Sequence, residues 1–149
     1  MLNISLIDFL KLKDIRFVNI TESAFRIRRI KGISIDSRSI EPDQIFWAIK
    51  GERFDGHAFV REAHAKSALC SVISESKFAE FSYDNLPLVI VPDTLNALQE
   101  LAHIQRLKYE IPVIALTGSN GKTTTKEMIA QIMQSKINIH KTKGNQNNQ

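Results

Sequence analysis

The residues from Gly118 to Thr123 read Gly-Ser-Asn-Gly-Lys-Thr, which places two glycines, a lysine and a hydroxyl close together. Glycine has no side chain, so its backbone N–H can approach a phosphate oxygen. A helix that begins near Lys122 would point free N–H groups and the positive end of its dipole at the anion. A lysine in this place reaches the β and γ phosphates, and the next hydroxyl holds Mg²⁺. The stretch therefore predicts a site for a nucleoside triphosphate and magnesium.

The general form of such a loop is G-x-x-x-x-G-K-[ST], and it would place a glycine where Leu116 stands. The loop here is a shortened form, flanked by a buried apolar run and an amphipathic helix. A strand–turn–helix connection without a ligand is the alternative, and Lys126 is typical of a solvated lysine. We expect the nucleotide to contact Gly118, Ser119, Asn120, Gly121, Lys122, Thr123 and Thr124.

Segments with strand and helix patterns alternate along the chain and must position this loop. Apolar or alternating runs predict strands over 25–30, 33–35, 45–49, 69–74, 86–92, 113–116 and 137–140. Apolar residues at helical spacing predict helices over 5–13, from about 57 to 66, from a cap at Asp93 or Thr94 to about Lys108, and from 122 onwards. In the last helix the expected apolar face is Met128, Ile129, Ile132 and Met133. The alternation indicates an α/β protein.

A boundary between two domains is expected near Tyr109. Residues 1–109 would form a small N-terminal α/β substrate-binding domain, and 110–149 would begin a mononucleotide-binding α/β domain. One or two strands and one helix are too little for a closed core. We therefore expect the chain to be a fragment that ends inside its second domain.

Composition argues against several classes of function. Apolar residues make up 43% and charged residues 24%, as in a globular protein. No apolar run is long enough to span a bilayer and the N-terminus does not resemble a signal peptide, so we expect a cytoplasmic protein without a membrane partner. The net charge of +4 is mild and no nucleic-acid-binding motif is present, so we expect no nucleic-acid partner. Cys70 is expected to be a buried, inert thiol, and Trp47 a core residue.

Four stretches, in this order, carry a family resemblance. They are IDSRSIEPDQIFWAIKGERFDGHAFV at 35–60, DTLNALQELA at 93–102, TGSNGKTTTKEM at 117–128 and KGNQNN at 143–148. They resemble the N-terminal signature, the interdomain helix, the shortened ATP loop and a following loop of the Mur ligase family, which builds the peptide of bacterial cell-wall precursors. One departure is Pro42-Asp43-Gln44, where the family often has Pro-Gly-Asp.

The resemblance implies an ATP-dependent amide ligase that requires Mg²⁺. The spelling SNGKTTTKEM with GNQNN is most similar to members that join D-alanyl-D-alanine to UDP-N-acetylmuramoyl-tripeptide through an acyl phosphate. In that reaction Lys122, as the catalytic residue, would stabilise charge on the transferred phosphate, and Thr123 would help to hold Mg²⁺. We expect a monomer that acts on these small molecules, and no ligase activity from residues 1–149 alone.

The resemblance also implies that the N-terminal domain grips the UDP end of the substrate. The planar fork of Arg38 suits a pyrophosphate, although a structural salt bridge with Asp36 or Asp43 is the alternative. His57 is equally typical of a helix-start histidine satisfied by backbone, and the asparagines near the end of the chain are equally typical of a plain polar turn. The expected substrate-binding set is Ser37, Arg38, Asp55, Gly56, His57, Asn145, Asn147 and Asn148.

Two other functions stay open. The sister ligase that adds the third amino acid to UDP-N-acetylmuramoyl-dipeptide usually reads Thr-Asn-Gly-Lys-Thr-Thr without the following Lys-Glu, and only this spelling argues against it. A non-catalytic nucleotide-binding module is the other. The Asp-Ser-Arg and Asp-Gly-His segments argue against that module, because a generic phosphate-loop protein has no reason to carry them.

Overall fold

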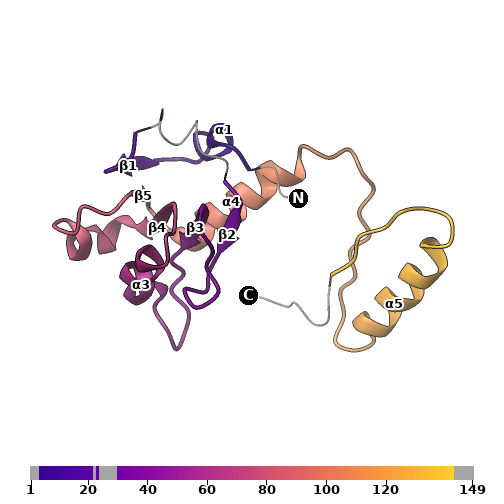
Figure 1. The fold of residues 1–149 in the computed structure, drawn as a ribbon. Coiled ribbons are helices and arrows are strands. Elements are labelled where there is room, and N and C mark those ends of the chain that lie inside the picture. The colour runs from indigo at the N-terminus through magenta and orange to yellow at the C-terminus, as the bar shows by residue number, and fades with distance from the viewer. Residues whose placement is uncertain (1–3, 22, 24–29, 143–149) are drawn as a thin grey trace. The chain divides into compact units, whose positions relative to one another are not determined.

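The chain divides into two compact units, Met1–Glu110 and Ile111–Gln149. The computed structural model describes residues 4–21, 23 and 30–142 of the 149 (Figure 1). The strand predicted over 25–30 therefore lies almost wholly outside the described residues. The two units are treated separately below.

The first unit is built on a five-stranded sheet with the order β1-β5-β4-β3-β2. The strands are β1 Arg16–Val18, β2 Gly32–Ser34, β3 Gln44–Trp47, β4 Cys70–Ser74 and β5 Leu88–Val91. Strands β2 to β5 pair in parallel, and β1 pairs antiparallel with β5. The runs QIFW, CSVIS and LVIV are almost entirely buried, as expected for parallel strands that are covered on both faces.

Helices cover both faces of this sheet (Figure 1). They are α1 Leu6–Phe9, the 3-10 helix η1 Gly56–Phe59, α3 Val60–Ala65, the 3-10 helix η2 Glu75–Phe81 and α4 Thr94–Arg106. Successive strand residues point to opposite faces. Trp47 accordingly lies in one core cluster with Leu101 of α4, and its neighbour Phe46 lies in a second cluster with Val60 of α3. The α/β architecture expected from the sequence is confirmed.

The helix α4 begins where the sequence indicates. The Asp93 carboxylate accepts a hydrogen bond from the Asn96 N–H at 2.7 Å and so caps the helix. The Trp47 indole donates to the Thr94 carbonyl at 2.7 Å, which ties β3 to the start of α4. Trp47 and Cys70 are both fully buried, and burial raises the pKa of the Cys70 thiol. Both were predicted to be core residues, and both predictions are confirmed.

The second unit contains the helix α5, Lys122–Met133. The strands predicted over 113–116 and 137–140 are wrong, because neither segment pairs as a strand. Val113 and Ile114 are 64% and 57% exposed. A strand needs a neighbour for its backbone N–H and C=O groups, and the described part of this unit supplies none. The predicted apolar face of α5 is also only partly correct, since Met128 and Ile132 are exposed.

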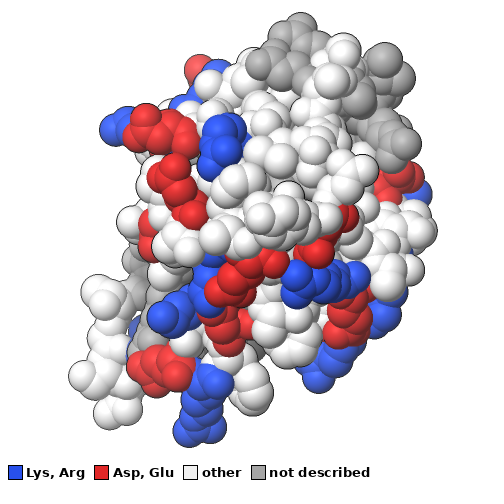
Figure 2. All heavy atoms as spheres, turned by 90° about the vertical axis from the view of Figure 1, so that its left-hand side faces the viewer, with Lys and Arg blue, Asp and Glu red and all other residues white. Residues whose placement is uncertain are grey.

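Charged side chains of both signs are interspersed on the face drawn in Figure 2. Ion pairs in the first unit include Arg61 with Asp84 at 2.7 Å and Lys77 with Glu80 at 2.6 Å. Such mixing is typical of a solvated surface without a field of one sign. No helix in the described ranges combines the length and hydrophobicity needed to cross a membrane.

Candidate functional site

The loop before α5 has a backbone shape that glycine adopts readily. Gly118 has a φ of 141° and Gly121 a φ of 79°, both in the range that L side chains rarely occupy. A Cβ added at Gly121 would meet no atom within 4 Å. Glycine is therefore required at Gly121 by the backbone conformation and not by crowding.

The N-terminus of α5 opens directly from this loop. Gly121 is the N-cap residue, and the helix has no side-chain cap. An uncapped N-terminus keeps its partial positive charge available to an anion. The Lys122 amine folds back and donates a hydrogen bond to the Gly118 carbonyl, so positive charge is held over the loop. Residues 118–121, 123 and 124 are all exposed. The arrangement suits an anion such as the phosphate chain of a nucleotide.

The Asp-Ser-Arg loop follows β2 and is held by an ion pair inside itself. The Arg38 guanidinium donates from Nε and Nη2 to the two carboxylate oxygens of Asp36, at 2.9 and 2.8 Å. These hydrogen bonds lower the pKa of Asp36 to about 2. The salt bridge left open for Arg38 is thus present, with Asp36 as its partner, while Asp43 pairs with Lys31 at 3.1 Å. The Arg38 side chain is nevertheless 84% exposed.

Ser37 precedes the arginine in the loop and is only 5% exposed. Its carbonyl accepts a hydrogen bond from the Lys66 amine at 3.0 Å, and that amine also contacts Glu62 at 2.8 Å. The hydrogen bond from Lys66 lowers the pKa of Glu62; burial opposes this effect, and the Ser37 hydroxyl adds a smaller lowering of its own. The end of α3 therefore fixes the loop that carries Arg38.

Asp55, Gly56 and His57 form a tight structural corner after β3. A Cβ on Gly56 would lie 2.8 Å from both the N and the O of Ile49, so close backbone approach requires glycine here. His57 is 3% exposed and has partners at both ring nitrogens. Nδ1 lies 2.6 Å from the Asp55 carboxylate, and Nε2 accepts the Ser74 N–H at 3.0 Å. This is the backbone-satisfied histidine that the sequence left as the second interpretation.

The same corner has the residue types of a nucleophilic triad. The Ser74 hydroxyl lies 3.2 Å from Nε2 of His57, and Asp55 lies on the other side of the ring. A general base needs a free lone pair toward the nucleophile. Here the lone pair of Nε2 already accepts the main-chain N–H of Ser74. His57 therefore positions the backbone of β4 and does not activate Ser74.

The charged groups at this corner are Asp55, Lys77 and Glu80. Burial raises the pKa of Asp55, but the hydrogen bonds from the His57 backbone and ring, together with the Lys77 charge, outweigh it and lower the pKa overall. Lys77 lies 3.6 Å from Asp55 and 2.6 Å from Glu80. The carboxylate therefore stays ionised beside two positive or polar partners.

A small cleft of about 160 Å³ opens beside this corner, at the carboxyl ends of β3, β4 and β5. Its lining consists of Lys50, Asp55, His57, Ser74, Ser76, Lys77, Pro92, Asp93 and Thr94. Ligands of parallel sheets bind at this edge, which also carries the loop after β2. Sequence reasoning placed Asp55 and His57 here but missed Ser74 and Lys77. Ser74 is the last residue of the buried strand β4 and Lys77 follows it in η2, so the end of this apolar run was the available signal.

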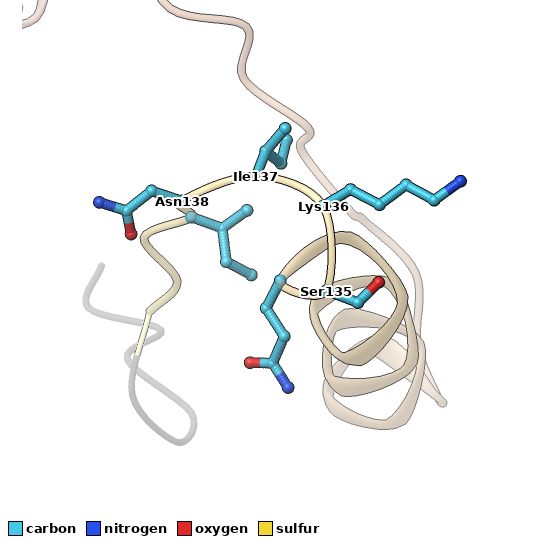
Figure 3. A pocket seen from close by; sticks show the side chains of 6 residues that line it. Ser135, Lys136, Ile137 and Asn138 are labelled. Carbon is cyan, nitrogen blue, oxygen red and sulfur yellow. The ribbon is translucent and has the colours of Figure 1, made fainter.

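The second unit has a larger hollow of about 440 Å³, at the turn after α5 and away from the glycine loop. It is lined by residues 134–139. Figure 3 shows Lys136 and Asn138 pointing away from each other. We do not assign it a ligand.

The remaining expectations are the three asparagines and the metal site. Asn145, Asn147 and Asn148 lie outside the described residues. Within the described ranges no group of three or more His, Cys, Asp or Glu side chains is arranged to hold a metal ion. The expected metal ligand Thr123 lies in the first turn of α5, beside Lys122.

Two protein-family models match this chain. The model described as Mur ligase family, catalytic domain, matches residues 29–106. The model described as Mur ligase middle domain matches residues 116–149.

Curated relatives are similar to this chain over most of its length. The UDP-N-acetylmuramoyl-tripeptide--D-alanyl-D-alanine ligase of Bacillus subtilis is 42% identical over 119 residues, which are 80% of this chain and 26% of the relative. The ligase of that name from Borreliella burgdorferi is 38% identical and covers 91% of this chain and 31% of the relative. The UDP-N-acetylmuramoyl-L-alanyl-D-glutamate--2,6-diaminopimelate ligase of Aquifex aeolicus is also 38% identical, over 74% of this chain and 22% of the relative. The chain thus spans about a quarter of the length of its curated relatives.

Solved structures give the same result. A crystal structure of MurF from Acinetobacter baumannii matches with a TM-score of 0.75 and 32% identity, over 89% of this chain and 28% of that one. MurF ligase from Thermotoga maritima in complex with ADP matches with a TM-score of 0.66 and 30% identity, over 79% of this chain and 26% of that one.

Proposed function

Since this chain belongs to the Mur ligase family, we propose that it is the N-terminal part of an ATP-dependent ligase that joins D-alanyl-D-alanine to UDP-N-acetylmuramoyl-tripeptide. The relatives from Bacillus subtilis and Borreliella burgdorferi carry the name of that activity. We place the reaction in the cytoplasm, where ATP is available. The first unit would bind the UDP end of the substrate, and the second would begin the ATP-binding domain.

The observation that carries this proposal is the glycine loop at the start of α5. Gly118 and Gly121 hold positive-φ backbone conformations, and neither carries a side chain that could block its own N–H group. The helix N-terminus behind them has no side-chain cap, and the Lys122 amine lies over the loop. A triphosphate needs N–H donors and a nearby positive charge, so these residues fit it.

ATP with Mg²⁺, when bound, supplies the phosphoryl group that activates the carboxylate of the UDP-linked peptide. The loop amides would orient the phosphates, and Lys122 would neutralise charge that develops during transfer. The Thr123 hydroxyl, one position further along α5, would be a ligand of the magnesium ion. Ser119, Asn120 and Thr124 would complete the contacts to the nucleotide.

The loop after β2 supports binding of the pyrophosphate of the UDP-sugar. Asp36 engages Nε and Nη2 of Arg38 and so fixes the plane of the guanidinium. A guanidinium has five N–H donors, so Nη1 retains donors for a phosphate oxygen. Ser37 is buried beside Lys66 and would act through the backbone of the loop as much as through its hydroxyl. Asp55, Gly56 and His57 would shape the neighbouring loop, and Asp55 and His57 line the cleft at this edge of the sheet.

The sister ligase is the second candidate, because the Aquifex aeolicus relative that carries its name is 38% identical. Offering both substrate pairs to one protein separates the two activities. A full-length protein with these residues should form product from UDP-N-acetylmuramoyl-tripeptide and D-alanyl-D-alanine. Product only from UDP-N-acetylmuramoyl-dipeptide and a diamino acid or lysine would transfer the assignment to the sister enzyme.

Two experiments test the proposal on this chain itself. Residues 1–149 alone should form no amide product from ATP and both substrates. Product formation would contradict the proposal that this chain is only the N-terminal part of the ligase. Calorimetry of the same chain with UDP-N-acetylmuramoyl-tripeptide should show binding that Arg38→Ala weakens. Lys31→Ala is the matched control. Lys31 precedes β2 and the Arg38 loop follows it, so the two residues lie at opposite ends of this strand. Equal heats for Arg38→Ala and the unchanged chain would remove Arg38 from the site.

A further inference from the structure

The last residues of the first unit stay hydrogen-bonded beyond the end of α4. The Leu107 N–H donates to the His103 carbonyl at 3.0 Å. The Tyr109 N–H donates to the Arg106 carbonyl at 3.2 Å, and the Arg106 guanidinium donates to the Tyr109 carbonyl in return. The chain is therefore held in turns as far as Tyr109, one residue before the last residue of this unit.

The side chain of Lys108 attaches these turns to a different helix. Its amine donates a hydrogen bond to the Asp8 carboxylate of α1. The helix α1 is itself fixed in the core, because Leu6 and Phe9, on either side of Asp8, are buried in one cluster with Leu101 of α4. The carboxylate that holds Lys108 is therefore part of the packed first unit and not a mobile surface charge.

The connection to the second unit begins directly after these attached residues. Residues 110–117 form no helix or strand, and all of them are exposed. The next regular element is α5, which begins at Lys122 behind the glycine loop. A segment with few buried contacts opens more easily than a packed helix. Lys108 and Tyr109 therefore mark the point at which the rigid part of the first unit ends.

We propose that Asp8 and Lys108 are positioning residues for the reaction, because their ion pair fixes the point at which the chain leaves the first unit and confines rotation between the units to the residues after Tyr109. The inference rests on the proposed function, in which one unit holds the UDP-linked substrate and the other holds ATP. Two groups on separate bodies react faster when fewer relative orientations are accessible to them. Loss of the pair would free the end of α4 and lengthen the flexible connection.

This role differs from that of a residue in either binding site. Neither Asp8 nor Lys108 belongs to the glycine loop, to the loop that carries Arg38, or to the lining of the cleft beside Asp55. Binding of each substrate by itself should therefore not depend on the pair. A pair that only stabilised the first unit would leave the rate of the folded enzyme unchanged. The positioning role predicts a lower kcat at unchanged affinities.

Hydrogen exchange of residues 1–149 tests the attachment without reference to the reaction. In Lys108→Met the amides of Leu107 and Tyr109 should exchange about tenfold faster than in the unchanged chain, because the ion pair no longer opposes local opening. Asp43→Val is the matched control. Asp43 has a φ of 66°, which a β-branched residue tolerates poorly, so this variant loses stability away from α1 and α4. It should leave both amides protected, and equal exchange in Lys108→Met and the unchanged chain would overturn the proposal.

Kinetics of a full-length protein test the consequence, at a temperature at which every variant is folded. Lys108→Met should lower kcat by about tenfold, since misplacement far from the chemistry can cost up to about 10²-fold. Its affinities for UDP-N-acetylmuramoyl-tripeptide and for a non-hydrolysable ATP analogue should stay within about twofold of the unchanged protein. Lys108→Arg, which keeps a charged donor for Asp8, should recover most of the loss. Asp43→Val should keep the wild-type kcat.

An unchanged kcat for Lys108→Met would overturn the proposal. An equal loss of kcat in Asp43→Val would overturn it as well, because the loss would then follow from lower stability. Weaker binding of both substrates by Lys108→Met would indicate disturbed binding sites and would also count against it. If the unchanged full-length protein forms no amide product, the proposed function fails and the catalytic role of the pair fails with it, while the exchange result still decides the attachment.

Discussion

The Lys108 amine lies 2.6 Å from the Asp8 carboxylate, across 100 positions of sequence. Asp8 belongs to α1 and is 1% exposed, while Lys108 follows the end of α4. The Ser5 N–H and hydroxyl donate to the same carboxylate oxygen, at 2.8 and 3.0 Å. This partly buried ion pair links the two helices that cover one face of the sheet.

The pair predicts a stability that depends on pH. Burial raises the pKa of Asp8, but the hydrogen bonds, that from Lys108 foremost, outweigh it and lower the pKa from 3.8 to about 2. A carboxyl group whose pKa is lower in the folded state stabilises the fold above its unfolded pKa, and this stabilisation is lost as the pH falls. The contribution should be about 2 kcal/mol at neutral pH and should disappear as the pH falls from about 4 to 2.

Denaturant unfolding of the wild type and Asp8→Asn across this pH range measures that contribution. The two should differ most above pH 5 and should converge toward pH 2. Asp14→Asn, at an exposed position, is the control and should follow the wild type throughout. A difference between wild type and Asp8→Asn that does not change with pH would show that the pair does not act through ionisation of Asp8.

Gly56 gives a second prediction, because neighbouring backbone atoms leave no room for a side chain at this position. A Cβ at this position would lie 2.8 Å from two backbone atoms of Ile49, and a backbone cannot move aside as a flexible side chain can. Gly56→Ala should therefore lower the free energy of unfolding by roughly 1–3 kcal/mol. At Gly51, in the same loop, the nearest atom would be 3.6 Å away, which is an ordinary contact. Equal stabilities of Gly56→Ala and Gly51→Ala, measured by thermal unfolding, would contradict this explanation.

Asp43 explains a departure from the family sequence. It stands where the family often has glycine, and its φ of 66° lies in the left-handed region. Aspartate tolerates this region better than most residues, and the Asp43 carboxylate also pairs with Lys31 at 3.1 Å. Asp43→Gly should leave the free energy of unfolding within about 1 kcal/mol, whereas Asp43→Val should cost about 1–2 kcal/mol. A valine variant as stable as the wild type in chemical denaturation would show that the turn relaxes out of this conformation.

Features encoded in short stretches could be predicted from the sequence. The buried strands β3, β4 and β5 are continuous apolar runs, and Asp93 precedes α4 as a cap. The glycine loop and the following helix were also found where the pattern placed them. In each case the signal lies within the residues that form the element.

Features that depend on distant partners could not be predicted. The three-residue strand β1 is too short to show a period and is defined by its pairing with β5. The two interpretations of His57 differ only through the N–H of Ser74, 17 positions away. The segment 113–116 is apolar like a buried strand but lacks a strand partner in the described residues. Lys126 looked solvated because its acceptor, the Thr142 carbonyl, is distant in sequence.

The direct test of the phosphate loop is the rate of ATP-dependent amide formation by a full-length protein carrying Lys122→Met, with Lys136→Met as the control. The loop predicts that Lys122→Met lowers kcat/KM by a factor on the order of 10²–10³, because preorganised charge at the transferred phosphate is lost. Lys136→Met should keep the wild-type rate. An unchanged rate for Lys122→Met would contradict the assignment of this loop to the nucleotide.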